Sequence, residues 1–248
     1  MTYEIAECRN CCMHYLVEVL NERGMRLLYN EWLDQDMLKA HYEGRPVNRS
    51  YDLLLGIIRR HFSNRSQPTL LDFGAGYGGL TSISQKNDFK THAFDLSEDK
   101  NHSAALAGIS IVEDLRQFPH YFDFIWVNQV LEHLANPSEV LKTLKASLAK
   151  GGFMYLAVPD CAVLDGAFVR QGLSRELFQM LSPHQHINAF TGKTLRLLAE
   201  KQGLAPLGLF DYLGMYSIGL GVKEMKFLAK KIIRNSASST GLLFKSEC

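Results

Sequence analysis

The stretch that decides the fold is Leu70-Leu-Asp-Phe-Gly-Ala-Gly-Tyr-Gly-Gly-Leu80. Its first residues predict a short buried strand, and three glycines at alternate positions follow that strand directly. Glycine tolerates positive φ and lets a ligand approach the backbone without a Cβ in the way. Because ligands bind beyond the carboxyl ends of strands in open parallel sheets, this loop predicts a pocket for a nucleotide-like ligand.

Strand and helix signals alternate around this loop. We expect strands at 69–73, 90–94, 109–112, 122–127 and 153–158, a further strand within 204–213, and helices at 51–62, 137–148 and 191–202. The run 122–127 is apolar at almost every position, which is typical of a strand buried on both faces. We expect Lys150-Gly-Gly152 to stop the helix before it. This alternation predicts a parallel sheet covered by helices.

The pattern divides the chain into three predicted parts. Residues 1–50 form a small N-terminal appendage, which serves as a substrate cap. Residues 51–213 form the ligand-binding domain, with an insertion at 161–190 that contains a helix near 175–181. Residues 214–248 supply a C-terminal strand or amphipathic helix and a frayed tail.

The composition excludes several classes of protein. The chain has 248 residues, 46% of them hydrophobic and 21% charged, with a formal net charge of +1. Such a balance provides no general field to attract nucleic acid. No window is apolar enough to span a membrane, and the first residues do not resemble a signal peptide. The five cysteines are therefore expected to be reduced thiols, and the protein to be cytoplasmic.

Two carboxylates accompany the glycine loop. Asp95 closes the second predicted strand 21 residues after Gly74, the offset at which an acid accepts hydrogen bonds from ribose hydroxyls. Asp72 lies inside the first strand, where it either holds the loop or faces a cationic ligand. The loop and Asp95 alone fit both S-adenosylmethionine (SAM) and a nicotinamide cofactor, although Asp72 is unusual for a dinucleotide fingerprint.

Further motifs within residues 70–160 follow in order. They are Val112-Glu-Asp-Leu115, Val127-Asn-Gln-Val-Leu-Glu-His-Leu134 and Leu148-Ala-Lys-Gly-Gly-Phe153, the last with Lys150 where proline is usual. With the glycine loop and Asp95, this series resembles the class I SAM-dependent methyltransferases. The resemblance implies an α/β, Rossmann-like, doubly wound, seven-stranded and mostly parallel sheet with helices on both faces, plus the N-terminal appendage.

The resemblance also implies which residues bind SAM. They are Asp72, Gly74, Ala75, Gly76, Gly78, Asp95, Leu96, Asp114, Leu115 and Asn128. The residues of the glycine loop surround the methionine part, and Asp95 takes the ribose hydroxyls. Leu96 and Leu115 sandwich the adenine. Asp114 lies near the adenine amino group, and Asn128 lies beneath the methionine.

On the acceptor side, residues 184–204 resemble small-molecule methyltransferases of the ubiquinone-methylating and sugar-methylating kind, in which a histidine segment borders the substrate pocket. The candidate catalytic bases are His133, His186 and His184, against the alternative that they are packing or loop histidines. Relatives that methylate catechol-like quinone precursors hold a divalent ion with a glutamate and a glutamate-histidine pair. Here Gln129 replaces the first acid, and Glu132 with His133 makes a poor site for a hard cation. We therefore expect no metal.

Two terminal features have alternative interpretations. Cys8-Arg-Asn-Cys11 resembles the remnant of a zinc module, but structural zinc takes four ligands, so ordinary reduced cysteines are expected. The basic helix expected at 222–234 either docks on the sheet or contacts a membrane surface weakly.

The leading functional prediction is SAM-dependent methylation of an oxygen or carbon atom of a small molecule. The alternatives are a nicotinamide-dependent oxidoreductase and a non-catalytic SAM-binding module. The sequence leaves the identity of the acceptor and the oligomeric state open.

Overall fold

The computed structural model describes residues 3–34, 36–37, 49–162, 164, 180–181, 184–207 and 239–246. The strands of its main sheet are β3 (Thr69–Phe73), β4 (Lys90–Phe94), β5 (Ser110–Ile111), β6 (Phe122–Asn128), β7 (Leu148–Pro159), β9 (Leu204–Pro206) and β10 (Ser239–Ser246). Their spatial order is β5-β4-β3-β6-β7-β10-β9. The five strands β5, β4, β3, β6 and β7 pair in parallel, and β10 is antiparallel to both of its neighbours. The order reverses at β3, and this places a topological switch point beside the glycine loop.

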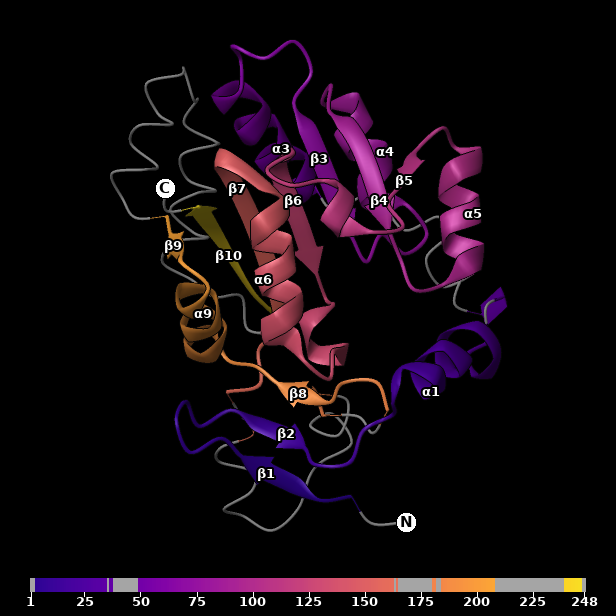
Figure 1. Ribbon diagram of the computed structural model, residues 1–248, viewed down its shortest axis with the longest axis vertical. Helices are drawn as coiled ribbons and strands as arrows, with labels where there is room; N and C mark the ends of the chain where they lie inside the picture. Colours follow the sequence, from indigo (N-terminus) through magenta and orange to yellow (C-terminus); the bar gives the residue numbers. More distant parts are fainter. Residues whose placement is uncertain are drawn as a thin grey trace.

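Helices cover both faces of this sheet (Figure 1). They are α3 (Arg49–His61), α4 (Gly79–Lys86), α5 (Glu98–Leu106), α6 (Pro137–Ser147) and α9 (Gly192–Lys201). Because alternate residues of a strand point to opposite faces, neighbours in β6 enter different cores. Phe124 packs with the α3 side chains, and Ile125 packs with those of α6 and α9. The expected doubly wound fold is confirmed.

A second, small sheet joins the N-terminal region to a distant segment. It consists of β1 (Ile5–Glu7), β2 (His14–Leu16) and β8 (Asn188–Ala189), in the order β1-β2-β8. The helix α1 (Glu22–Leu27) and a π-helical turn η1 (Leu28–Trp32) follow β2. Figure 1 shows these elements beyond the carboxyl ends of the parallel strands. The N-terminal residues therefore lie at the edge of the main sheet where ligands are expected.

A C-terminal strand or amphipathic helix was expected within 214–248, with a frayed tail at its end; the structure has a strand at 239–246, so the expected fraying is wrong for these residues. These residues form β10, which pairs with β7 from Ser239↔Pro159 to Lys245↔Phe153 and with β9. Phe244 of this strand is fully buried in the core on the α6 side. The strand inserts between two others, so it satisfies the backbone hydrogen bonds of both.

The expected helix stop at Lys150-Gly-Gly152 is also wrong. Helix α6 already ends at Ser147, and β7 runs through both glycines. The pairing of β6 with β7 shifts register between Phe122 and Phe124, opposite this stretch. Gly151 has a φ of +73°, and a Cβ at Gly152 would lie 2.9 Å from the Ala149 carbonyl oxygen. Glycine is therefore needed here for a bulge inside a strand.

Three expectations reach residues outside the described ranges. The predicted helix at 222–234 lies wholly outside them, and that at 175–181 lies mostly outside them. The predicted strand within 204–213 corresponds to β9 over its first three residues. Among the described residues, no helix is both long and apolar enough to cross a membrane.

Candidate functional site

The glycine loop has the backbone that its sequence predicts. Gly74, Gly76 and Gly78 all have positive φ, at +81°, +56° and +79°. The N–H groups of Gly74 and Ala75 both donate to the carbonyl oxygen of Phe94, at 2.7 and 3.1 Å, which ties the loop to the end of β4. A Cβ at Gly76 would meet nothing within 4 Å. The loop thus leaves open space beside Gly76.

Asp95 lies against this loop. Its Oδ2 accepts a hydrogen bond from the Gly76 N–H at 2.9 Å, and its Oδ1 accepts one from Ser97 N–H at 2.9 Å. The Lys100 ammonium lies 3.8 Å from Oδ1. Each carboxylate oxygen has a second lone pair, so Asp95 can still accept hydrogen bonds from a ligand. The structure therefore brings Asp95 and the loop together, as the sequence predicted.

Asp72 is buried below the loop, with 3% of its surface exposed. Within the described residues, its Oδ2 has no hydrogen-bond partner. Burial and the nearby Asp95 carboxylate raise the pKa of Asp72 to about 8. The charged form of Asp72 is therefore disfavoured in the absence of a positively charged group near it. The structure thus leaves Asp72 Oδ2 available for an interaction with a ligand.

The remaining residues expected at the cofactor follow the neighbouring strands. Leu96 comes two residues after β4 and is 37% exposed, and Leu115 begins the 3-10 turn η2 (Leu115–Gln117). Asp114 caps that turn by accepting from the Arg116 N–H, and the Arg116 side chain holds the pKa of Asp114 below its usual range. These residues follow strands β4 and β5, which are parallel and end at one edge of the sheet.

Asn128 ends β6, two strands away from β4 in the sheet. Its Oδ1 accepts a hydrogen bond from the Tyr51 hydroxyl at 3.3 Å. Tyr51 belongs to α3 and its ring contacts Trp126 edge-on. Helix α3 thus holds the Asn128 side chain in place. The sequence predicted Asn128 at the site but did not predict this contact with Tyr51.

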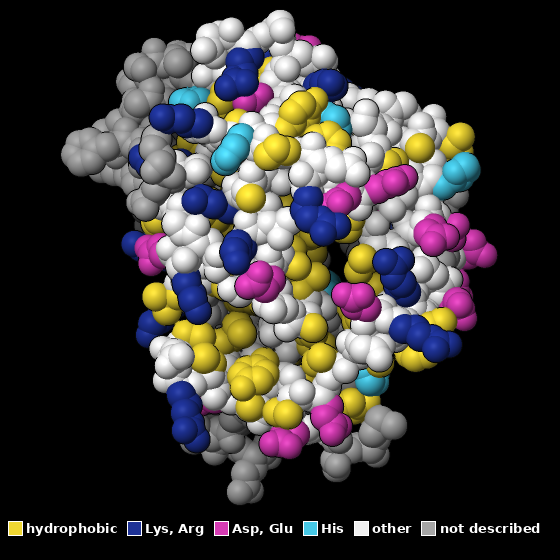
Figure 2. Space-filling view, viewed as in Figure 1, with side chains coloured by type: hydrophobic (Ala, Val, Ile, Leu, Met, Phe, Trp, Pro, Cys, Tyr) yellow, Lys and Arg dark blue, Asp and Glu magenta, His cyan; other side chains and the backbone are white. Residues whose placement is uncertain are grey.

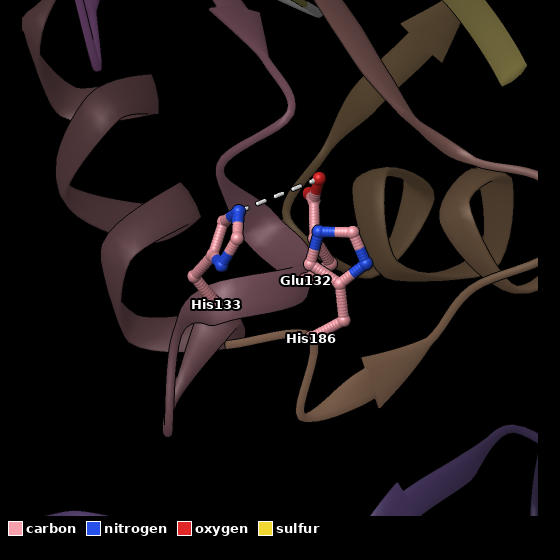
Figure 3. Close-up of side chains that lie close together, drawn as sticks. All are labelled: Glu132, His133 and His186. Atoms are coloured by element: carbon pink, nitrogen blue, oxygen red, sulfur yellow. Dashed lines mark ion pairs between the residues drawn. The ribbon is translucent and has the colours of Figure 1, made fainter. Parts of the chain in front are cut away.

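Acceptor-side candidates gather after β6. The 3-10 turn η3 (Leu131–His133) carries Glu132 and His133, and His186 reaches them from the segment before β8 (Figure 3). The His133 and His186 rings have centroids 4.8 Å apart, and the His133 Nε2 lies 3.8 Å from the Glu132 Oε1. Burial lowers the pKa of His133 to about 4 and raises that of Glu132 to about 8. Two of the three predicted histidines therefore lie side by side, next to a buried acid.

His184 is separate from this pair. Its Nε2 lies 3.1 Å from the Tyr3 hydroxyl, and its φ is +70°. The His184 ring also contacts the Tyr3 ring edge-on. His184 therefore connects the N-terminal segment to the segment before β8.

The π-helical turn η1 supplies residues that the sequence prediction missed. The Tyr29 ring contacts His133 edge-on with centroids 6.3 Å apart, and Lys100 lies 5.8 Å from its centroid. Lys100 also pairs with Asp95, so Tyr29 lies between the loop side and the histidine side of the site. Burial, followed by the charges of Glu132 and Asp95, raises the pKa of Tyr29. No periodicity in residues 1–50 could have indicated this placement.

The face shown in Figure 2 is hollowed near its middle, between the surface over α6 and that over α5. Acidic and basic side chains lie around the rim of this hollow, and hydrophobic side chains lie along one wall. In the sequence, α5 follows β4 and α6 follows β6. The hollow thus opens on the side of the molecule where the strand ends converge.

The N-terminal cysteines lie in the turn between β1 and β2. The Cys8 N–H donates to the Met13 carbonyl, and the Cys12 N–H donates to the Cys8 carbonyl, both at 2.8 Å. Within the part of the chain that the structure describes, no disulfide bond involves Cys8, Cys11, Cys12 or Cys161. Among the described residues, those able to hold a metal in a group of three or more are Glu132, His133 and His186, not these cysteines.

The fold and the loop define a class I methyltransferase. A family model described as a methyltransferase domain matches residues 45–208. The chain belongs to this family, which confirms the resemblance drawn from the motifs.

Curated relatives and solved structures agree with this assignment. The chain is 32% identical to the ubiquinone biosynthesis O-methyltransferase of Caulobacter vibrioides over 100 residues, which are 36% of this chain and 40% of that protein. The chain spans 40% to 58% of the length of the first curated relatives it matches.

Two solved structures share the fold over nearly the whole chain. The plantazolicin methyltransferase BamL, in complex with a triazolic desmethylPZN analogue and S-adenosylhomocysteine (SAH), has a TM-score of 0.60 at 17% identity, and the match covers 90% of this chain and 94% of that one. The Burkholderia thailandensis 1,6-didemethyltoxoflavin-N1-methyltransferase has a TM-score of 0.54 at 16% identity and covers 98% of this chain and all of its own.

Proposed function

We propose that this chain transfers the methyl group of SAM to an oxygen or carbon atom of a small-molecule acceptor. The observation that carries the proposal is the contact between the Gly76 N–H and the Asp95 carboxylate at 2.9 Å, within a loop of three left-handed glycines. This contact holds the backbone of the glycine loop next to Asp95, the acid proposed to bind the ribose. Family membership, the oxygen-methylating activity in the names of curated relatives and the SAH in solved structures of the same fold support the proposal.

In this proposal the cofactor lies across the strand ends. The glycine loop with Ala75 holds the methionine part. The Asp72 carboxyl group, whose Oδ2 has no hydrogen-bond partner among the described residues, faces the cationic end of that part. Asp95 accepts hydrogen bonds from the ribose hydroxyls. The other proposed contacts are those of Leu96 and Leu115 with the adenine, of Asp114 with its amino group, and of Asn128 with the methionine. The open space at Gly76 supports this arrangement, because a bound ligand would fill it.

The acceptor side is proposed to include His133 and His186. Methyl transfer is an in-line displacement in which the acceptor atom forms a bond to the methyl carbon while the bond to the sulfonium breaks, leaving SAH. An enzyme mainly aligns the two reactants, and good alignment contributes on the order of 7–11 kcal/mol. A hydroxyl acceptor must also lose its proton, so the imidazoles act on it either as proton acceptors or through an ion that they hold in common. The contact of His184 with Tyr3 gives that histidine a role in holding the N-terminal segment.

A labelling experiment tests the proposal. The purified protein is incubated with SAM that carries an isotopically labelled methyl group and with a small-molecule extract, and the products are analysed by mass spectrometry. We expect labelled small molecules that are absent when Asp95→Ala replaces the wild-type protein. A chain that is stabilised by NAD and not by SAH in thermal unfolding would instead support the nicotinamide alternative. A cytoplasmic location stays a prediction from the sequence.

A further inference from the structure

We propose that Glu132, His133 and His186 bind a divalent transition-metal ion at the acceptor side of the site. One ligand atom from each residue lies within 4.8 Å of the others, and His133 Nε2 is 3.8 Å from Glu132 Oε1. Zinc bonds of about 2.0–2.2 Å place neighbouring ligand atoms roughly 3–4 Å apart. Small side-chain rotations would therefore close the group around one ion. Figure 3 shows that the three side chains converge from two segments of the chain.

Glu132 supplies an independent observation. Only 1% of its surface is exposed, and within the described residues neither carboxylate oxygen has a hydrogen-bond partner. A buried polar group without a partner is costly, and a buried charge costs more unless it is paired or coordinates a metal. The carboxylate lies toward the two imidazoles, so the missing partner belongs between them.

The tautomer of His133 is already that of a metal ligand. Its Nδ1 lies 2.8 Å from the carbonyl oxygen of Gln185. A carbonyl oxygen can only accept, so Nδ1 carries the hydrogen, and the lone pair of the neutral ring is on Nε2. That atom is the one that lies near Glu132. A hydrogen bond from the second ring nitrogen to a backbone carbonyl is the usual support of a metal-binding histidine.

Hydrogen bonds join the two segments that carry the three proposed ligand residues, the η3 turn and the segment before β8. The Ile187 N–H donates to the Glu132 carbonyl oxygen at 2.8 Å, and the Asn188 side-chain amide donates to the Leu134 carbonyl oxygen at 2.7 Å. These bonds hold the segment of His186 against the turn that carries Glu132 and His133. The ligand positions are thus set by the fold before an ion arrives, which lowers the entropic cost of binding.

The ligand chemistry determines the class of metal. Two imidazoles and one carboxylate suit zinc, cobalt, manganese or iron, whereas Mg²⁺ and Ca²⁺ prefer oxygen ligands. The expectation of no metal rested on Glu132 and His133 alone, which are adjacent in the sequence. His186 adds a third ligand that only the fold brings near. Three protein ligands leave at least one position for a further molecule, and a hydroxyl bound there would lose its proton more readily. This last role rests on the proposed function, but binding of the ion does not.

Binding of Co²⁺ tests the inference because its visible spectrum reports the ligands and their geometry. The wild-type chain is treated with a chelator, dialysed and titrated with Co²⁺, followed by calorimetry and absorption. We expect one Co²⁺ per chain, a spectrum of nitrogen and oxygen ligands without thiolate charge transfer, and affinity at least 100-fold weaker in His186→Ala and in Glu132→Gln. The matched control is His184→Ala, which removes an imidazole two residues away and should retain the affinity.

The outcomes separate this inference from the proposed function. SAH affinity is measured for the same variants, together with their thermal unfolding, so that a folding defect is recognised. Loss of Co²⁺ affinity with unchanged SAH affinity and unchanged unfolding supports the inference. No stoichiometric Co²⁺ in the wild type, equal affinity in the wild type and both ligand variants, or a thiolate spectrum that disappears with Cys8→Ser and Cys11→Ser would overturn it. Binding of Co²⁺ without any binding of SAH would leave the metal site standing and contradict the proposed function.

Discussion

Substitution of Gly76 by alanine tests whether the open space beside the glycine loop is where the ligand binds, provided that its effect on folding stability is measured separately. Its φ is +56°, and a Cβ there would meet nothing within 4 Å. Gly108, in the turn between α5 and β5, offers a matched control, because its φ is +77° and a Cβ there also meets nothing within 4 Å. Both substitutions place alanine in the left-handed region, at a cost of about 1–2 kcal/mol each.

The two variants should therefore unfold alike and bind differently. Each 1 kcal/mol lost from the free energy of unfolding lowers the melting temperature by roughly 2–4 °C in a chain of this size. We expect calorimetry without ligand to show similar decreases in the melting temperature for Gly76→Ala and Gly108→Ala. Only at Gly76 does the added methyl enter space proposed for the methionine part of the cofactor. Overpacking costs about 1–3 kcal/mol, which corresponds to roughly 5- to 150-fold weaker SAH binding.

Isothermal titration with SAH measures this difference directly. Gly108→Ala should bind SAH as the wild type does. The reasoning is refuted if Gly76→Ala binds SAH with wild-type affinity, because the space at the loop would then not be where the ligand lies. Equal losses of affinity in both variants would also refute it, since the effect would then follow from backbone strain in general.

Three further predictions concern titratable groups. Asp95→Ala removes the acceptor of the Gly76 N–H and the proposed ribose contacts, so calorimetry should show at least tenfold weaker SAH binding, and unchanged affinity would place the ribose elsewhere. The pKa of Asp72 is about 8, and a cationic ligand would lower it, so SAH binding at pH 7 should release a proton. Titrations in buffers of different ionisation enthalpy detect that release, which should vanish in Asp72→Asn; its persistence there would assign the proton to another group. Burial lowers the pKa of His92 to about 4, so the stability that neutral His92 contributes is complete above pH 6.5 and is lost as the pH falls toward 4. Denaturant unfolding of the wild type and His92→Gln should show this difference in pH dependence, and parallel curves would contradict it.

The central half of the fold could be predicted from the sequence because its signals are local. β3 and β6 are apolar runs buried on both faces, and the glycine loop requires positive φ at fixed positions. Asp95 could be placed for the same reason, since it closes a strand that is parallel to β3. These features depend on neighbours in the sequence or on the regular spacing of a parallel sheet.

The parts that could not be predicted depend on contacts between distant segments. A strand or helix was expected within 214–248, but only pairing with β7 and β9 places the strand β10 at Ser-Thr-Gly-Leu-Leu-Phe-Lys-Ser, residues 239–246. His186 meets Glu132 because the Ile187 N–H donates to the Glu132 carbonyl oxygen, a contact between segments more than 50 residues apart, and the two-residue strand β8 beside it leaves no periodicity to detect. Tyr29 reaches His133 from a π-helical turn that no apolar pattern indicates. The acceptor side was therefore less predictable than the cofactor side.

The central claim is that SAM lies on the glycine loop with its ribose at Asp95 and its methyl group toward His133 and His186. A crystal structure of this chain with bound SAH tests the claim most directly. The account predicts ribose hydroxyls within hydrogen-bond distance of the Asp95 carboxylate and the sulfur on the side of the loop that faces the two histidines. SAH bound away from the loop, or with its sulfur turned away from the histidines, would contradict it.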